Sequence, residues 1–256
     1  MTTSPVLGER LRAGETIYVG WSTLTDTILV DNVARAGFDA VLLDSQHGLH
    51  DVASLIAGIG AVAGAGKPAI VRIPVGDGAL ASRVLDFGAE AVLAPMVNSV
   101  EDALALVGAT KYPPIGERSW GPARALVLRG TDGQSHLSAG NRVTVTIAMI
   151  ETDRALGFLD DILAVDGIDG VFVGPSDLSI TMSDGARLAP MDPMLDTALA
   201  MVADKANAAG KFAGVYAANA ERAVFFRSLG YRLIGLGSDV VYLASGIRTM
   251  LAAAKA

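Results

Sequence analysis

The sequence has no cysteine, no basic cluster and no long uninterrupted apolar run. The absence of cysteine excludes disulfides, thiolate metal sites and a cysteine nucleophile. The net charge is −7, and lysine and arginine are dispersed, so nucleic acid and an anionic membrane surface are not expected partners. Glycine, aspartate or proline interrupts every apolar stretch well short of a bilayer span, and residues 1–12 lack the apolar region of a signal peptide. We therefore expect a cytoplasmic protein.

What the chain does contain is apolar sequence in short, regularly spaced segments. Of its 256 residues, 51% are hydrophobic and 29 are glycine, which suits a large core with many tight turns. The length is typical of one barrel domain, and no linker divides the chain, so we expect a single domain over residues 1–256.

Eight short apolar runs alternate with longer segments of helical period. This order favours a closed parallel (β/α)8 TIM barrel over an open sheet. The predicted strands are Ile17–Ser22, Ala40–Ser45, Ala69–Pro74, Ala91–Val97, Val143–Ile150, Gly170–Pro175, Phe212–Ala217 and Arg232–Ser238.

A weak internal repeat accompanies these strands. Gly37, Gly88, Gly167 and Gly230 each stand a few residues before a strand, where a left-handed glycine would end the preceding helix. Parallel α/β proteins in general share this pattern, so it favours a barrel without requiring one. The segment Lys111–Asn141 does not fit the repeat. It is rich in glycine, proline and arginine, as functional or interface loops often are.

The carboxyl ends of barrel strands meet at the face where active sites form, and polar residues follow several predicted strands there. Glu151 and Asp177 follow neighbouring strands, and no cysteine or histidine adjoins them. Two carboxylates in this setting suit a hard divalent ion such as Mg²⁺ or Mn²⁺. The alternative is that each carboxylate only caps the helix that follows it.

His47 follows the second strand and is a candidate general base, with Asp44 or Asp86 as the carboxylate that orients it. The alternative is a hydrogen-bonded loop histidine. His50 and His136 lack such a setting, and we expect both to face solvent.

Arg72 lies inside an otherwise apolar strand, where its charge needs a partner. A substrate carboxylate or a developing enolate would supply one, and a structural ion pair with a neighbouring strand is the alternative. A Schiff-base mechanism needs a desolvated lysine in the site. None of the five lysines follows a strand at this face, so carbanion chemistry here would need a metal ion as electron sink. The lysines are Lys67, Lys111, Lys205, Lys211 and Lys255.

Taken together, these motifs resemble the HpcH/HpaI aldolases, class II pyruvate aldolases that act on 4-hydroxy-2-oxo acids. The resemblance covers nearly the whole chain and rests on four stretches, the last of them the most specific. They are Ala36–Asp39 leading to Asp44–Gly48, Val71–Pro74, Tyr112–Arg118, and Ile150–Thr152 followed by Gly167–Ser179.

The resemblance implies a role for each matching residue. Glu151 and Asp177 would bind Mg²⁺, Mn²⁺ or Co²⁺, and His47 would be the base, oriented by Asp44 or Asp86. Arg72 would stabilise charge on the keto oxygen of the substrate. The remaining substrate contacts would come from Trp21, Gly174 and Ser176. The expected barrel is of the phosphoenolpyruvate/pyruvate type, and the expected assembly is a homohexamer that exchanges the last helix, within the apolar run Val240–Ala254, between subunits.

One position departs from the family pattern, because Gln46 stands where the family usually has glutamate. This change removes a negative charge beside His47 but leaves the metal pair intact. We therefore expect reversible cleavage of a 4-hydroxy-2-oxo acid to pyruvate, or a close 2-oxo acid, and an aldehyde. The alternatives are a family relative that acts on a CoA thioester or decarboxylates a 2-oxo diacid, and a non-catalytic barrel that binds carboxylates.

Overall fold

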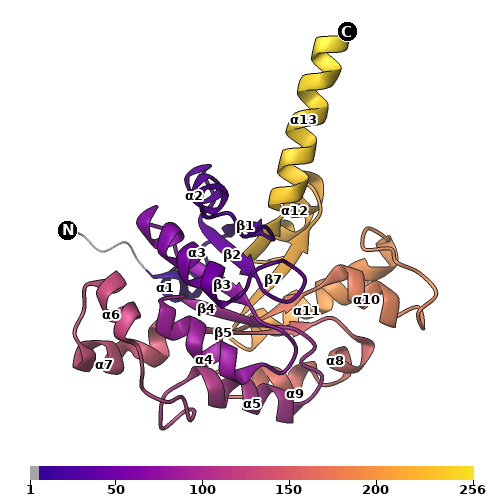
Figure 1. Ribbon diagram of the computed structural model, residues 1–256. Coiled ribbons are helices and arrows are strands. Elements are labelled where there is room, and N and C mark those ends of the chain that lie inside the picture. Colours follow the sequence, from indigo (N-terminus) through magenta and orange to yellow (C-terminus); the bar gives the residue numbers. More distant parts are fainter. Residues whose placement is uncertain (1–5) are drawn as a thin grey trace.

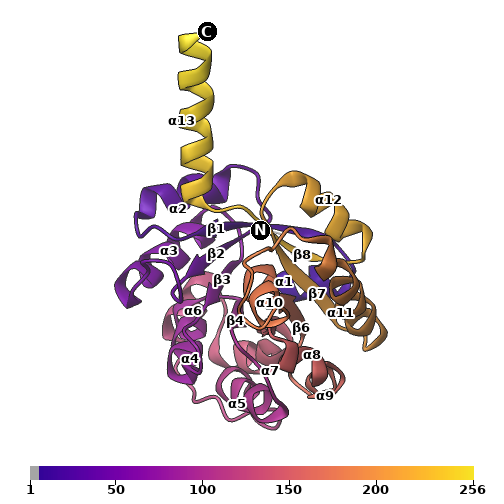
Figure 2. The ribbon, with the colours of Figure 1, turned by 90° about the vertical axis from the view of Figure 1, so that its right-hand side faces the viewer.

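The computed structural model describes residues 6–256, which form a closed barrel of eight parallel strands surrounded by helices (Figures 1 and 2). Each strand pairs with its neighbours in sequence, and β8 closes the barrel against β1. The predicted (β/α)8 barrel is therefore confirmed. The strands are β1 Ile17–Ser22, β2 Ala40–Asp44, β3 Ala69–Arg72, β4 Ala91–Ala94, β5 Val145–Ile150, β6 Gly170–Val173, β7 Phe212–Ala217 and β8 Leu233–Leu236.

The helices follow the strands in the expected alternation. They are α1 Leu7–Arg12, α2 Thr27–Arg35, α3 Val52–Gly64, α4 Gly78–Phe87, α5 Val100–Thr110, α6 Ala123–Arg129, α7 Gly133–Val143, α8 Asp153–Gly157, α9 Leu159–Ala164, α10 Pro175–Thr181, the 3₁₀ turn η1 Pro193–Leu195, α11 Asp196–Ala208, α12 Ala220–Ser228 and α13 Asp239–Lys255. Helix α13 projects away from the barrel (Figures 1 and 2). Within residues 6–256, no helix combines the length and apolarity needed to cross a membrane.

Two apolar layers hold the barrel together. The outer layer packs one face of the strands against the surrounding helices. The inner layer fills the barrel, where Leu7 and Leu11 of α1 pack with interior strand residues such as Ile17. The same inner layer includes Trp21 and Phe172, which line the cavity described below. The filled interior places that cavity at the carboxyl ends of the strands.

The structure confirms the glycine repeat and corrects the segment after α5. Gly37, Gly88, Gly167 and Gly230 all have positive φ, between 93° and 112°, as the predicted helix ends require. The segment Lys111–Asn141, which we interpreted as a long loop outside the repeat, contains α6 and most of α7. Its glycine and aspartate residues act as helix boundaries: Gly130 ends α6 in the left-handed conformation, and Asp132 caps α7 by accepting from the Ser135 N–H.

Candidate active site

A cavity of about 290 Å³ opens at the carboxyl ends of the strands. Eight of the nine site residues predicted from the sequence line it, namely Trp21, Asp44, His47, Arg72, Glu151, Gly174, Ser176 and Asp177. The other lining residues are Thr23, Met149, Phe172, Pro175, Tyr216 and Ser238. The barrel thus brings together residues that are up to 217 positions apart in the sequence, from Trp21 to Ser238, because every strand ends at the same face.

Arg72 and Asp44 form a two-pronged ion pair between the adjacent strands β3 and β2. Arg72 Nε donates to Asp44 Oδ1 at 2.9 Å, and Nη2 donates to Oδ2 at 2.5 Å. Trp21 Nε1 also donates to Asp44 Oδ2, at 3.2 Å, and the guanidinium lies over the Trp21 ring. Burial raises the pKa of Asp44, but the hydrogen bond and charge of Arg72 outweigh it and hold that pKa below its ordinary value. The charge of Arg72 is therefore already paired within the chain.

This pair leaves part of the guanidinium available to a ligand. An arginine has five N–H groups, and Asp44 accepts from two of them. The two alternatives that the sequence left open for Arg72 are therefore compatible: it forms an ion pair with a neighbouring strand, and it also lines the cavity. Asp44 fixes the plane of the guanidinium, and the remaining N–H groups can donate to a ligand in the cavity.

Asp44 reaches His47 through the backbone. Its Oδ1 accepts from the N–H groups of Gln46 and His47, at 3.0 and 3.2 Å, which fixes the turn after β2. The His47 side chain is exposed at the cavity, and within residues 6–256 its ring makes no hydrogen bond. The Gln46 side-chain oxygen is buried without a hydrogen-bond partner among the same residues. Asp44 thus positions the loop that carries His47 and does not orient the imidazole directly.

Asp86 is the predicted site residue that the structure places elsewhere. It lies near the C-terminal end of α4, at the amino ends of the strands, and accepts from Arg118 Nη2 at 2.6 Å. His47 follows the carboxyl end of β2, so the two residues lie at opposite ends of the barrel within one chain. The expectation that Asp86 orients His47 is therefore not met within the chain. Asp86 lies at this end because α4 starts after the carboxyl end of β3 and runs back along the barrel toward the amino ends of the strands.

Glu151 is a buried carboxylate with little to neutralise its charge. It is 2% exposed, and its Oε1 accepts from the Met96 N–H at 2.8 Å. Met96 is one of two non-glycine residues in the described chain with positive φ, at 56°, and this conformation directs its N–H toward Glu151. Burial, followed by the repulsion of nearby Asp177, raises the pKa of Glu151 to about 7. The contribution of Met96 was not visible in the sequence.

This donor set fits a hard divalent cation. Neither Glu151 nor Asp177 forms an ion pair with any residue from 6 to 256. A cation between them would stabilise the ionised form of Glu151, which burial and the charge of Asp177 disfavour. Gly174 makes room for the carboxylate, because a Cβ there would lie 2.4 Å from Glu151 Oε2. The described chain has no group of three or more His, Cys, Asp or Glu side chains arranged to hold a metal. A two-carboxylate site leaves coordination positions for water and substrate oxygens.

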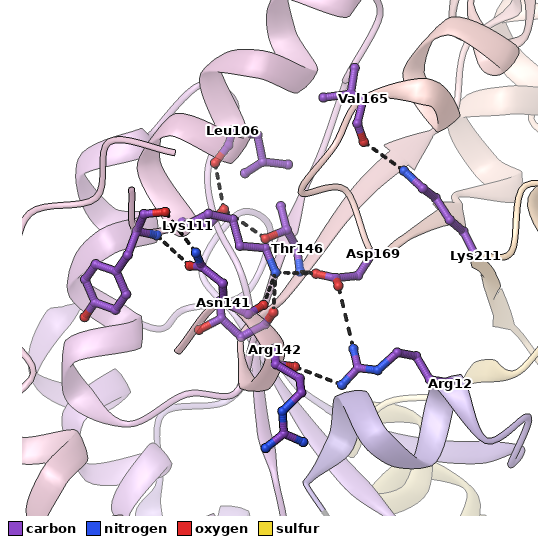
Figure 3. Close-up of polar contacts among 12 residues, drawn as sticks. Arg12, Leu106, Lys111, Asn141, Arg142, Thr146, Val165, Asp169 and Lys211 are labelled. Atoms are coloured by element: carbon purple, nitrogen blue, oxygen red, sulfur yellow. Dashed lines mark hydrogen bonds and ion pairs between the residues drawn. The ribbon is translucent and has the colours of Figure 1, made fainter. Parts of the chain in front are cut away.

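The lysines lie away from this cavity, as the sequence indicated. Lys111 is buried at the amino ends of β5 and β6, where its Nζ contacts Asp169 at 2.6 Å, the Thr144 carbonyl at 2.5 Å and the Asn141 carbonyl at 3.0 Å (Figure 3). Lys211 donates to the Val165 carbonyl in the same region (Figure 3). All five lysines fall within the described residues, and none lines the cavity. A Schiff base therefore has no amine available in this site.

Two histidines that we expected to face solvent are buried. His50 is 6% exposed, and its Nε2 lies 3.2 Å from Ser22 Oγ. His136 is 7% exposed and packs edge-on against Tyr112 and Trp120. Both predictions were wrong, because each histidine gains polar or aromatic neighbours from segments far away in the sequence.

The fold and the site together define a (β/α)8 barrel with two carboxylates beside an arginine in the cavity at the carboxyl ends of its strands. Comparison with known proteins agrees: the family model described as HpcH/HpaI aldolase/citrate lyase matches residues 18–245. The chain belongs to this family, which confirms the predicted class II aldolase, a carbon–carbon lyase.

Named relatives and a solved structure resemble the chain over nearly its full length. It is 35% identical to a hydroxypyruvate/pyruvate aldolase of Roseovarius nubinhibens, over 94% of this chain and 93% of the relative. It is 34% identical to a 4-hydroxy-2-oxo-heptane-1,7-dioate aldolase of Klebsiella pneumoniae, over 95% and 91%. A crystal structure of a family protein from Burkholderia cenocepacia superposes with a TM-score of 0.87 at 28% identity, covering 98% of this chain and 99% of that one.

Proposed function

We propose that the chain reversibly cleaves a 4-hydroxy-2-oxo acid to pyruvate, or a close 2-oxo acid, and an aldehyde. The observation that carries this proposal is that two carboxylates without ion-pair partners in the described chain, Glu151 and Asp177, lie around one cavity with an arginine and a histidine. The two carboxylates would hold Mg²⁺, Mn²⁺ or Co²⁺, whose chemistry when bound is to polarise the 2-oxo group as a Lewis acid. The names of the relatives, which specify pyruvate and a 4-hydroxy-2-oxo diacid, support this substrate class.

The remaining roles follow from where each side chain lies. The substrate carboxylate is held by the Ser176 N–H, which stands in the first turn of α10 and has no partner within that helix. His47 takes the proton of the C4 hydroxyl, the C3–C4 bond breaks, and C4 leaves as the aldehyde carbonyl. The electron pair of that bond becomes the enolate of pyruvate, toward which Arg72 donates the N–H groups that Asp44 leaves free. A proton returned to C3 completes pyruvate.

Proton exchange on pyruvate tests this proposal without knowledge of the physiological aldehyde. Enolate formation exchanges the methyl protons of pyruvate for deuterium in D₂O, which NMR detects directly. We expect exchange that depends on both enzyme and divalent metal, together with cleavage of 4-hydroxy-2-oxo acids. Metal binding without exchange or cleavage would instead identify a non-catalytic carboxylate-binding barrel. Turnover confined to a CoA thioester or to decarboxylation of a 2-oxo diacid would move the chain to another reaction of the family.

The assembly is also a proposal. Apolar side chains of α13 are exposed on the single chain, between 43% and 75%, and the helix projects away from the barrel (Figure 2). These residues are Val240, Val241, Leu243, Ile247, Met250 and Leu251. We propose that they pack against partner subunits in a homohexamer, as the resemblance implies. Sedimentation analysis of the intact protein tests this, and a monomer would contradict it.

A further inference from the structure

A buried carboxylate at the start of α13 binds the segment that follows β1. Asp239 is 1% exposed, and its two oxygens accept from the Thr23 N–H at 2.8 Å, the Thr23 hydroxyl at 2.6 Å, the Leu24 N–H at 2.9 Å and the Ser22 hydroxyl at 3.2 Å. It forms no ion pair with any residue in the described part of the chain. These hydrogen bonds, with a further one from the Val240 N–H at 2.9 Å and the N-terminal position of Asp239 in α13, stabilise this charge in the interior. They also connect α13 to residues 22–24.

The same segment contacts the loop that carries His47. The Leu49 N–H donates to the Thr23 carbonyl at 2.8 Å, and His50 Nε2 lies 3.2 Å from Ser22 Oγ. Gly48 lies so close to this segment that an added Cβ would be 3.1 Å from Thr23 Cα. Residues 48–50 thus rest on residues 22–24 through a backbone hydrogen bond, a side-chain contact and close packing.

His50 completes the network as a buried, neutral member. Burial lowers its pKa, and the facing carboxylates Asp239, Asp44 and Asp51 only partly oppose this effect. Its other ring nitrogen, Nδ1, lies 3.3 Å from Ser54 Oγ in the first turn of α3. His50 therefore connects the end of β1 to α3 without adding a charge.

We propose that Asp239 is a positioning residue for the aldol reaction, because it fixes the segment on which the His47 loop rests. Asp239 does not line the cavity, whereas Thr23 and His47 do. Asp239 acts on the reaction through those residues. Its removal should displace the His47 imidazole from the C4 hydroxyl, whose proton the imidazole takes. This inference rests on the role of His47 in the proposed function and extends it to a residue 192 positions further along the chain.

A double-mutant cycle tests whether Asp239 acts through His47. Asp239→Asn keeps the side-chain volume but replaces one acceptor oxygen with an NH₂ group. We expect kcat for cleavage to fall about 10- to 100-fold, the range for losing hydrogen bonds to a charged group. The KM for the 2-oxo acid and the metal activation constant should stay unchanged, because Glu151 after β5 and Asp177 in α10 lie outside the segment that Asp239 binds. In a His47→Ala background the same change should alter the residual rate less than about twofold.

Asp77→Asn is the matched control. Asp77 caps α4 by accepting from the Leu80 N–H, also follows a strand at its carboxyl end, and does not line the cavity. It should lower thermal stability, as the loss of a helix cap does, and leave kcat unchanged. An equal loss of kcat from Asp239→Asn in both His47 backgrounds would overturn the proposal, as would full activity of the folded Asp239→Asn variant.

Hydrogen exchange supplies a measurement that does not depend on activity. In Asp239→Asn the Leu49 amide should exchange at least about tenfold faster than in the wild type, since its acceptor segment is no longer fixed. In Asp77→Asn its rate should not change. If His47→Ala keeps wild-type turnover, the base assigned in the proposed function is wrong. The exchange rate of the Leu49 amide then still tests whether Asp239 fixes the loop. An unchanged Leu49 rate in Asp239→Asn would contradict the inference.

Discussion

A carboxylate with limited solvent exposure lies at each end of the barrel, the partly buried Asp169 just before β6 and the buried Glu151 just after β5. Asp169 accepts from Lys111 Nζ at 2.6 Å and from the Thr146 N–H at 2.8 Å, and Arg12 lies 3.8 Å away (Figure 3). Glu151 accepts from one backbone N–H, and its charged neighbours are Asp177, which raises its pKa, and Arg72, which lowers it without forming an ion pair. The charge of Asp169 is thus neutralised within the chain, while Glu151 has no ion-pair partner there and leaves charge for a ligand to neutralise. The contrast suggests a division of roles in which Asp169 contributes to stability and Glu151 to the reaction, as is usual for the two faces of such barrels.

The largest expected effect comes from removing a ligand charge at the carboxyl end. Glu151→Gln or Asp177→Asn should abolish metal-dependent turnover while the barrel still folds, because each change keeps the side-chain volume and deletes one charge. Glu151→Gln also removes a buried, uncompensated carboxylate, so the metal-free variant should be at least as stable as the wild type. Turnover in metal-buffered assays and thermal unfolding measure the two effects, and near-normal activity of either variant would sink the metal assignment.

Arg72→Lys tests the ion pair at the carboxyl end. An ammonium can still pair with Asp44, but it cannot make two aligned bonds to that carboxylate and also donate into the cavity. We expect kcat to fall on the order of 10²–10³-fold, as for the loss of one oxyanion donor. Steady-state kinetics decide the point. A raised KM at normal kcat would mean that Arg72 only binds the ground state.

Lys111→Met tests the ion pair at the amino end, where we expect the opposite outcome. The change leaves Asp169 without its closest cation, and we expect a loss of about 2–3 kcal/mol in unfolding free energy. This is less than for a fully buried pair, because Asp169 is 20% exposed and Arg12 lies near it. The kcat of the folded variant should not change. Lys205→Met is the matched control, since Lys205 pairs with Asp160 on the surface and should contribute below about 1 kcal/mol. A selective loss of kcat in Lys111→Met would show that the two ends are not separable.

The raised pKa of Glu151 predicts a smaller, graded effect of pH. In the metal-free protein this carboxyl holds its proton up to about pH 7, compared with 4.5 when unperturbed. Its raised pKa therefore contributes stability that is fully present below pH 4.5 and is lost as the pH rises through 7. Metal binding must displace this proton, so Mg²⁺ affinity should rise by up to about tenfold per pH unit toward pH 7 and then level off. Calorimetric titration at several pH values checks this, and a flat profile over that range would contradict it.

The sequence predicted the barrel and most of the cavity because both depend on local patterns. The alternation of strand and helix periods predicted the order of the elements. The carboxyl ends of barrel strands share one face, which predicted that Glu151, Asp177, Arg72 and His47 lie together. The predicted strands overran their ends where proline, as at Pro74 and Pro95, cannot continue the ladder.

The residues that the sequence did not reveal depend on contacts between distant segments. Asp239 meets residues 22–24 only when β8 closes against β1, and Met96 aims its N–H at Glu151 only in a rare backbone conformation. The burial of His50 likewise needs Ser22, which lies 28 positions away. No periodicity or motif marks such pairings.

The central claim is that the electron sink at the carboxyl end is a metal ion held by carboxylates, with no lysine involved. A Schiff-base aldolase passes through an iminium that borohydride reduces to a stable lysine adduct. The structure places every lysine away from the cavity and places Glu151 and Asp177 within it. EDTA should therefore abolish activity, Mg²⁺, Mn²⁺ or Co²⁺ should restore it, and borohydride with pyruvate should leave the intact mass unchanged. A mass raised by one reduced pyruvate adduct, with activity that survives EDTA, would contradict the account.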